Sequence, residues 1–223
     1  MALLELKEVN KVFKSGKTEI EALKPTNFIA EAGELIAVIG PSGSGKSTFL
    51  TIAGGLQTPS NGDVLINGNN LIDLKEKKRA SLRLKEIGFV LQSSNLVPFL
   101  TVQQQMKLLD KVKKDNLRED QLEQMYDSLG IGELLNSFPS DLSGGQRQRV
   151  AIAKALYTDP SIILADEPTA SLDSDRAFEV MDMLKAATKQ NKKTTIVVTH
   201  DTRLIDYCDK VYKITDGLLK LEA

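Results

Sequence analysis

The chain has 223 residues, of which 41% are hydrophobic and 26% charged, with a formal net charge of −1. This composition suits one large globular domain and lacks the basic excess of a nucleic-acid-binding protein. A single cysteine, Cys208, excludes an internal disulfide and fits a reducing compartment. No apolar run approaches the roughly 18 residues of a membrane span, and the first residues lack a secretory signal. We therefore expect a cytoplasmic protein that reaches a membrane only through a partner.

The first part of the chain predicts a small antiparallel sheet. Residues 4–9 alternate between apolar and charged side chains, as a half-exposed strand does. After a glycine turn, residues 19–30 predict a pair of strands with one exposed face. Residues 63–68 predict one more short strand. We expect these strands to form a small sheet beside a parallel core.

A glycine-rich loop separates a buried strand from a helix. The apolar run 35–39 predicts the strand, and a helical pattern begins at Thr48. The loop has the complete spacing G-x-x-x-x-G-K-S, which comprises Gly40, Pro41, Ser42, Gly43, Ser44, Gly45, Lys46 and Ser47. Its glycines let the backbone wrap around an anion, because a Cβ would block both the torsion angles and the approach. The context predicts a phosphate-binding loop rather than a turn with a solvated lysine.

This loop predicts a site for ATP and Mg²⁺. The unpaired amides at the start of the helix, including that of Thr48, are expected to face the phosphates. Lys46 is expected to reach the β- and γ-phosphates, and the Ser47 hydroxyl to ligate Mg²⁺. Upstream, the flat ring of Phe13 suits either adenine stacking or the protein core, and both interpretations stay open at this point.

Polar residues also follow three other predicted strands. They are Gln92 after residues 86–91, Asp166 and Glu167 after residues 161–165, and His200 after residues 194–199. In open α/β sheets, ligands bind at the carboxyl ends of the strands. We therefore expect these side chains to share one rim with the glycine loop.

Their chemistry suggests distinct roles around Mg·ATP. Asp166 is expected to order the Mg²⁺ shell, and Glu167 to polarise the attacking water as general base. His200 is expected to hold the γ-phosphate and that water in line. Gln92 is expected to contact both metal and water and so to sense the γ-phosphate.

Helices interrupt the core strands between residues 101 and 135. We expect one domain over residues 1–223, with a helical subdomain inserted at roughly residues 93–147. An apolar loop precedes these helices and consists of Leu96, Val97, Pro98, Phe99 and Leu100. It suits either a docking groove for a partner helix or local packing under the helices.

A second glycine-led helix start follows the inserted helices. Its residues are Leu142, Ser143, Gly144, Gly145 and Gln146. One interpretation is a second anion site, which a head-to-tail dimer would press against the nucleotide held by its twin. The other is an ordinary helix cap, because serine is a favoured N-cap residue.

Together these motifs resemble those of ABC-transporter ATPase subunits, over about residues 3–217. The segments that carry the resemblance are 40–47, Gln92, 142–146, 162–167, 171–173 and His200. The resemblance implies an α/β fold: a P-loop NTPase core with a RecA-like parallel sheet, an N-terminal antiparallel β-subdomain and an inserted helical subdomain. It also implies that Phe13 stacks on adenine, that Asp173 lies in a loop crossing the dimer interface, and that two chains sandwich two ATP.

Finer motifs resemble the MacB/LolD-like branch, and within it the haem-exporter ATPases of Gram-positive bacteria. These motifs are residues 87–92, 95–98, 165–176 and 199–204. The branch implies a separate permease at the inner face of the plasma membrane and the export or extraction of an amphiphile such as haem, a peptide, a lipoprotein or a drug. The segment Thr-Val-Gln-Gln-Gln at 101–105 departs from the Thr-Val-x-Glu-Asn common in the branch.

Two rival functions remain to be weighed against transport. An ABC ATPase of nucleic-acid maintenance or translation would need an inserted coiled coil or a second cassette, and the chain has neither pattern. A P-loop kinase would leave residues 142–146 unexplained. We therefore expect no nucleic-acid partner and ATP hydrolysis to water.

Overall fold

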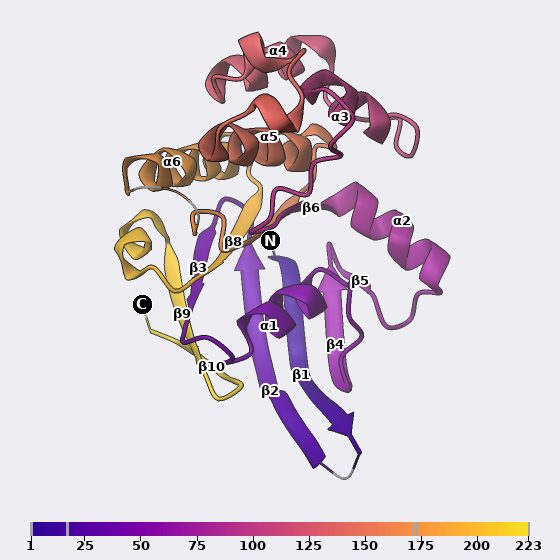
Figure 1. The fold of residues 1–223 in the computed structure, drawn as a ribbon. Coiled ribbons are helices and arrows are strands. Elements are labelled where there is room, and N and C mark those ends of the chain that lie inside the picture. Colours follow the sequence, from indigo (N-terminus) through magenta and orange to yellow (C-terminus); the bar gives the residue numbers. More distant parts are fainter. Residues whose placement is uncertain (1, 17, 171, 173, 223) are drawn as a thin grey trace.

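The computed structural model describes residues 2–16, 18–170, 172 and 174–222, which fold around two β-sheets (Figure 1). The strands are β1 (Ala2–Ser15), β2 (Thr18–Glu31), β3 (Leu35–Ile39), β4 (Asn61–Ile66), β5 (Asn69–Asn70), β6 (Ile87–Val90), β7 (Ile162–Asp166), β8 (Thr194–Thr199), β9 (Lys210–Thr215) and β10 (Leu218–Leu221). The α-helices are α1 (Lys46–Ala53), α2 (Glu76–Glu86), α3 (Val102–Leu109), α4 (Glu119–Ser128), α5 (Gly144–Tyr157) and α6 (Ser174–Gln190). Short 3₁₀ helices are η1 (Gly132–Leu134), η2 (Pro139–Asp141) and η3 (Thr202–Tyr207).

The predicted antiparallel sheet is confirmed, with the strand order β2-β1-β4-β5. Its β1–β2 hairpin corrects one prediction, because residues 19–30 belong to one long strand and not to two. Pro25 cannot donate a ladder hydrogen bond, and it lies where the register shifts between the pairs Val9–Thr26 and Lys11–Leu23. The irregular register accommodates the proline without ending the strand.

The second sheet has the order β10-β9-β3-β8-β7-β6 and is parallel from β9 to β6. All five residues of β3 are buried, as expected for a strand covered on both faces. In the register, Ile39 pairs with Thr199 and Asp166 with Val198. The carboxyl ends of these strands therefore form one rim, and the chain after each of them emerges there.

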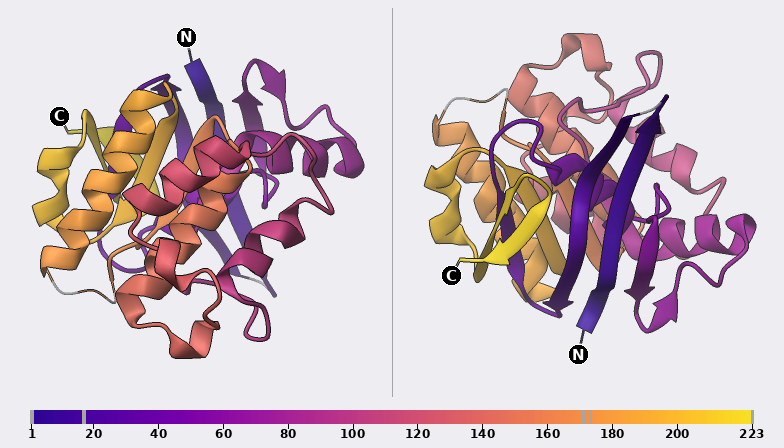
Figure 2. Two further views of the ribbon diagram at one scale, coloured as in Figure 1. Left: turned by 90° about the horizontal axis from the view of Figure 1, so that it is seen from above. Right: turned by 90° about the horizontal axis from the view of Figure 1, so that it is seen from below.

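Two apolar clusters cover the two faces of this sheet. One joins α1 to the antiparallel sheet, and Phe49 of α1 meets Phe28 of β2 at 5.1 Å between ring centroids. The other joins the sheet to α5, α6 and the inserted helices. Figure 2 shows these faces, with the helices in front when seen from above and the β1–β2 hairpin in front when seen from below.

The sequence predicts a helix over residues 147–157, after the glycine-led segment, whereas α5 begins three residues earlier, at Gly144. Ser143 Oγ accepts a hydrogen bond from Gln146 N at 3.3 Å, and Gln146 Oε1 accepts one from Ser143 N at 2.7 Å. This reciprocal capping box satisfies amides that would otherwise lack partners, so the glycines enter the first turn. Among the residues described, no helix combines the length and apolar character needed to cross a bilayer.

Candidate nucleotide site

The glycine loop connects β3 to α1 through left-handed backbone. Gly43 has φ +78° and Gly45, the N-cap of α1, has φ +110°. A Cβ on Gly45 would lie 2.3 Å from Ala22 O, so only glycine fits there. The first helical hydrogen bond joins Phe49 N to Gly45 O at 2.9 Å, and the amides of residues 46–48 precede it.

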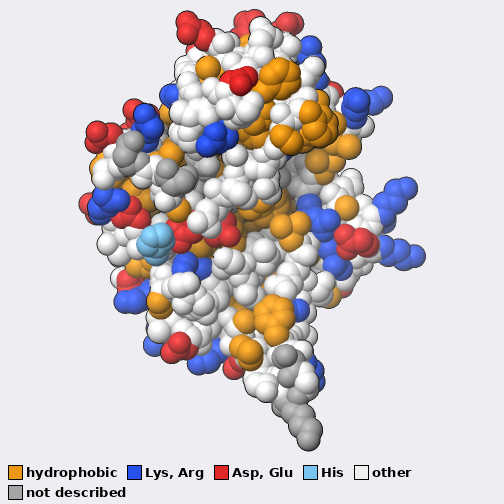
Figure 3. Space-filling model, viewed as in Figure 1, with side chains coloured by type: hydrophobic (Ala, Val, Ile, Leu, Met, Phe, Trp, Pro, Cys, Tyr) orange, Lys and Arg blue, Asp and Glu red, His pale blue; other side chains and the backbone are white. Residues whose placement is uncertain are grey.

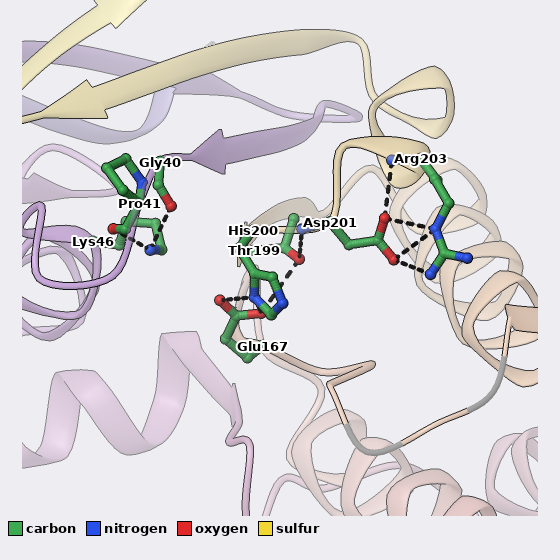
Figure 4. Close-up of polar contacts among 8 residues, drawn as sticks. All are labelled: Gly40, Pro41, Lys46, Glu167, Thr199, His200, Asp201 and Arg203. Carbon is green, nitrogen blue, oxygen red and sulfur yellow. Dashed lines mark hydrogen bonds and ion pairs between the residues drawn. The ribbon is translucent and has the colours of Figure 1, made fainter.

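Two further features of this loop suit the binding of an anion. Ser44 Oγ is buried and has no hydrogen-bond partner in the described structure. The Lys46 side chain curls over its own loop, and its Nζ donates to Gly40 O at 2.8 Å and to Pro41 O at 2.9 Å (Figure 4). Amides, a hydroxyl and an ammonium thus converge on one loop, which is the donor set that a polyphosphate requires.

Asp166 lies beside the start of α1, as the sequence predicted. Burial is the main cause that raises the pKa of its carboxyl, and Glu167 adds to the rise, while a hydrogen bond from Ser47 and the charge of Lys46 oppose it. Within the described chain, no three acidic, histidine or cysteine side chains gather as a metal site. The Ser47 and Asp166 oxygens suit Mg²⁺, which binds few protein ligands and takes the rest from phosphates and water.

Glu167 and His200 form a close side-chain pair on this rim. His200 Nδ1 lies 2.9 Å from both Glu167 carboxylate oxygens, and Thr199 Oγ1 donates to Glu167 Oε2 at 3.4 Å. Glu167 has φ +47°, which is strained for a residue other than glycine, and its amide donates to Val198 O at 2.9 Å. The Glu167 side chain is 15% exposed and the His200 side chain 67% exposed. Figure 3 shows the histidine at the surface, and Figure 4 shows its contact with Glu167.

Gln92 does not join these side chains directly. It follows β6 and has an exposed side chain, and no hydrogen bond in the described structure connects it with Asp166 or Glu167. Its backbone lies past the carboxyl end of its strand, as predicted. The contact expected with metal and water therefore stays a prediction.

Phe13 lies on the β1–β2 hairpin opposite Ile20, and not in the core. Its ring is 40% exposed, and the Lys11 ammonium lies 5.3 Å from the ring centroid. The core alternative for this aromatic is therefore wrong. An exposed flat ring leaves the stacking interpretation open.

The Ser143 segment forms the helix cap described above. Its role as a second anion site in a dimer stays a prediction. A small hollow of about 150 Å³ lies beside it, lined by Ser143, Gly145, Gln146, Arg149, Leu172, Arg176, Glu179 and Val180. No hydrogen bond between described residues joins Ser143 to the glycine loop of the same chain. The prediction for Asp173 lies outside the described residues.

One known protein family matches most of this chain. The profile described as "ABC transporter" matches residues 23–170. The chain belongs to the ABC transporter family. It is an ATP-binding and ATP-hydrolysing subunit of a transporter, and the sequence-based expectations of fold class and enzyme activity are confirmed.

Individual relatives cover nearly the whole cassette. The hemin import ATP-binding protein HrtA of Staphylococcus haemolyticus is 47% identical over 98% of this chain and 99% of its own length. HrtA of Staphylococcus saprophyticus is 45% identical over 97% and 98%. The structure of the ATP-binding cassette MJ0796 described as dimeric, post-hydrolysis and bound to ADP and Pi is 36% identical, with a TM-score of 0.86 over 98% of both chains. CbiO1 from Clostridium perfringens is 32% identical, with a TM-score of 0.85 over 99% of this chain and 87% of CbiO1.

Sequence reasoning missed the polar contacts made by the residues next to His200. Thr199 contacts Glu167, and Asp201 pairs with Arg203 just beyond the histidine (Figure 4). An Asp-x-Arg spacing directly after the histidine was the available signal, because a carboxylate and a guanidinium two residues apart in a turn can pair.

Proposed function

We propose that two copies of this ATPase enclose Mg·ATP head to tail and that hydrolysis drives a permease that exports haem or a similar amphiphile. The observation that carries the proposal is the Glu167–His200 pair, held beside the Ser47–Asp166 pair on the rim that carries the phosphate loop. A general base next to a metal-ligand pair is the arrangement that nucleotide hydrolysis requires.

The loop residues supply the nucleotide contacts. The backbone from Gly40 to Thr48 would cradle the phosphates, and Lys46 would exchange its two loop carbonyls for the β- and γ-phosphates. Phe13 would stack on the adenine through its exposed ring. These roles follow from donor chemistry and exposure.

The rim residues supply the chemistry. Ser47 and Asp166 would hold Mg²⁺, with Gln92 approaching when γ-phosphate is present, and the ion would neutralise phosphate charge. Glu167 would take the proton of the attacking water. His200 would keep Glu167 oriented and hold the γ-phosphate and the water in line.

The second copy would complete the site through Ser143, Gly144, Gly145 and Gln146. Side chains of this segment cap the N-terminus of α5, and a small hollow lies beside it. Asp173 would lie in the loop that crosses the interface. Dimeric MJ0796 cassettes, 36% identical to this chain, support the assembly.

The permease would dock on the loop of residues 96–100. Phe99 is 75% exposed and Phe138 is 43% exposed, and hydrogen bonds from Val102 N to Ser137 O and from Gln103 N to Leu135 O bring their segments together. Figure 3 shows apolar side chains gathered over this helical part of the molecule. An amphipathic helix of a membrane partner matches such a surface.

The docking loop is fastened to α3, and the residue before it is fastened to α5. Gln105 of α3 is fully buried; its amide donates to Val97 O at 2.8 Å and to Leu100 O at 3.0 Å, and it accepts from Val97 N at 3.1 Å. Lys154 of α5 donates to Asn95 O at 3.0 Å, and burial lowers the pKa of its ammonium. Gln105 occupies one of the two positions, with Gln104, where the sequence departs from its branch. A partner pressing on this loop would therefore push on α3 and α5.

The relatives and the branch resemblance support the proposed substrate, direction and location. HrtA proteins carry the name of hemin transport, which supports haem as the substrate class. Their printed name says import, whereas the branch resemblance implies export, and we propose export. The protein would sit on the inner face of the plasma membrane through its permease, with residues 93–147 acting as the helical subdomain that meets it.

The decisive experiment for the site is size-exclusion chromatography of Glu167→Gln with Mg·ATP. We expect a dimer with ATP and a monomer without it, while the wild type returns to monomer as it hydrolyses. A variant that stays monomeric under every nucleotide condition would refute the head-to-tail arrangement.

A second experiment tests partner and substrate. Pull-down from membranes and from a nucleic-acid fraction should recover a permease and leave DNA and RNA behind. With that permease in inside-out vesicles, ATP should drive haem into the lumen for an exporter. Outward movement would indicate import, and capture of nucleic acid alone would favour the maintenance or translation class.

A further inference from the structure

We infer that Arg203 is a positioning residue for hydrolysis, which holds the Glu167–His200 pair by fastening the turn after β8 to the start of α6. Its guanidinium makes a bidentate pair with Asp201, through Nε to Oδ1 at 2.9 Å and Nη2 to Oδ2 at 2.6 Å. A third donor, Nη1, reaches Ser174 Oγ at 2.7 Å. Ser174 is the first residue of α6. The inference rests on the proposed roles of Glu167 and His200.

The contacts continue from Asp201 to the proposed general base. Asp201 N donates to Thr199 Oγ1 at 3.0 Å, and Thr199 Oγ1 donates to Glu167 Oε2 at 3.4 Å. His200 lies between Thr199 and Asp201 in the chain and faces the same carboxylate. The path from Ser174 to Glu167 is therefore continuous, and Figure 4 shows its section from Arg203 to Glu167.

The contacts of the Arg203 side chain serve to orient its neighbours more than to stabilise the fold. Its side chain is 57% exposed, and exposed ion pairs contribute little to folding. The planar guanidinium fixes Asp201 in two directions and α6 in a third, which a lysine could not reproduce. Because small misplacements of catalytic groups reduce rates strongly, the loss should appear in kcat.

One competing explanation is local capping of η3. Asp201 Oδ1 accepts a hydrogen bond from Arg203 N at 3.0 Å and so caps that short helix without the guanidinium. A purely capping role would make the Arg203 side chain dispensable. It would also leave no reason for Ser174 to matter, since Ser174 lies outside η3.

The test compares Arg203→Met, Arg203→Lys, Ser174→Ala and the double variant Ser174→Ala/Arg203→Met, with Arg118→Met as control. Arg118 pairs with Asp120 on an exposed part of α4. kcat and KM for Mg·ATP, and the thermal midpoint, are measured for each variant.

We expect Arg203→Met to lower kcat about tenfold, with KM and the thermal midpoint close to those of the wild type. Ser174→Ala should lower kcat by about threefold, and Arg203→Lys should restore little. The double variant should lose no more than Arg203→Met alone, because both changes break one path. Arg118→Met should match the wild type.

Unchanged kcat in Arg203→Met, or losses that multiply in the double variant, would overturn the inference. If Arg203→Met fails to fold, Ser174→Ala decides, because it removes only one acceptor, and an unchanged kcat there overturns the inference as well. Full activity of Glu167→Gln would instead refute the proposed site, whatever Arg203 does.

Discussion

His200 Nδ1 lies 2.9 Å from both carboxylate oxygens of Glu167, although the two residues are 33 positions apart in the sequence. Two parallel strands bring them together, because β7 and β8 pair directly and end on the same rim. The imidazole is the more exposed partner, so it can orient the carboxylate and also meet a phosphate. We therefore expect the pair to act as one unit.

The first prediction concerns His200→Ala. Removal of the ring should lower kcat by about 100-fold or more, because Glu167 loses its orienting partner and the γ-phosphate a donor. KM for ATP should change little, since the phosphate loop and Phe13 are untouched. Phosphate release under saturating Mg·ATP measures this. His200→Gln, which keeps a donor amide, should recover part of the rate, and wild-type turnover in His200→Ala would contradict the pairing.

The second prediction contrasts two glycines of the phosphate loop. Gly43→Ala meets no atom within 4 Å and should cost only the strain of a left-handed backbone, about 1–2 kcal/mol. Gly45→Ala also drives a Cβ to 2.3 Å from Ala22 O, so its cost should exceed about 4 kcal/mol. Urea unfolding of both variants measures the difference. Equal losses would show that the clash with β2 relaxes freely.

Local patterns predicted most of the fold. The strand at 35–39 and the glycine loop after it are specified by neighbouring residues, and both were placed correctly. The start of α5 was predicted too late in the chain, because Ser143 and Gln146 satisfy each other's amides and extend the helix toward its N-terminus. Residues 19–30 were predicted to form a pair of strands, but they belong to one strand, because register shifts with β1 accommodate Pro25.

Local sequence patterns predicted part of the site as well, but they did not predict its contacts between distant residues. The ends of the strands could be predicted from the sequence, and with them the positions of Asp166, Glu167 and His200 on one rim. The contact between Arg203 and Ser174 spans 29 positions and joins a turn to a helix start, and no periodic pattern reports such a pair. The exposure of Phe13 likewise depends on how far the hairpin projects.

The third prediction concerns Asp166→Asn and Mg²⁺. Burial raises the pKa of the Asp166 carboxyl, so the folded protein disfavours the charged form and is destabilised by it as pH rises above the unfolded pKa. At neutral pH, the amide should therefore leave the thermal midpoint unchanged or raise it without nucleotide. It should also abolish the extra stabilisation by Mg·ATP over ATP with EDTA, because the proposed metal ligand is gone.

Differential scanning fluorimetry with ATP, with and without Mg²⁺, measures this effect. Asp182→Asn, at an exposed position on α6, is the matched control and should respond to Mg²⁺ as the wild type does. A Mg²⁺-dependent shift of normal size in Asp166→Asn would remove Asp166 from the metal site.

The fourth prediction concerns Gln105, whose buried amide satisfies three backbone groups of the docking loop. Gln105→Leu leaves Val97 N and Leu100 O without this partner, while Val97 O keeps its hydrogen bond from Leu100 N at 3.2 Å. Each buried unsatisfied group costs about 1–3 kcal/mol unless the loop opens to water. We therefore expect faster amide exchange over residues 97–100 and basal ATPase activity near that of the wild type. Stimulation by the permease should fall, because a loosened loop cannot push on α3.

Gln103→Leu is the matched control, since Gln103 is exposed on the same helix and makes no side-chain hydrogen bond in the described structure. Exchange and stimulation that match this control would show that Gln105 serves packing alone.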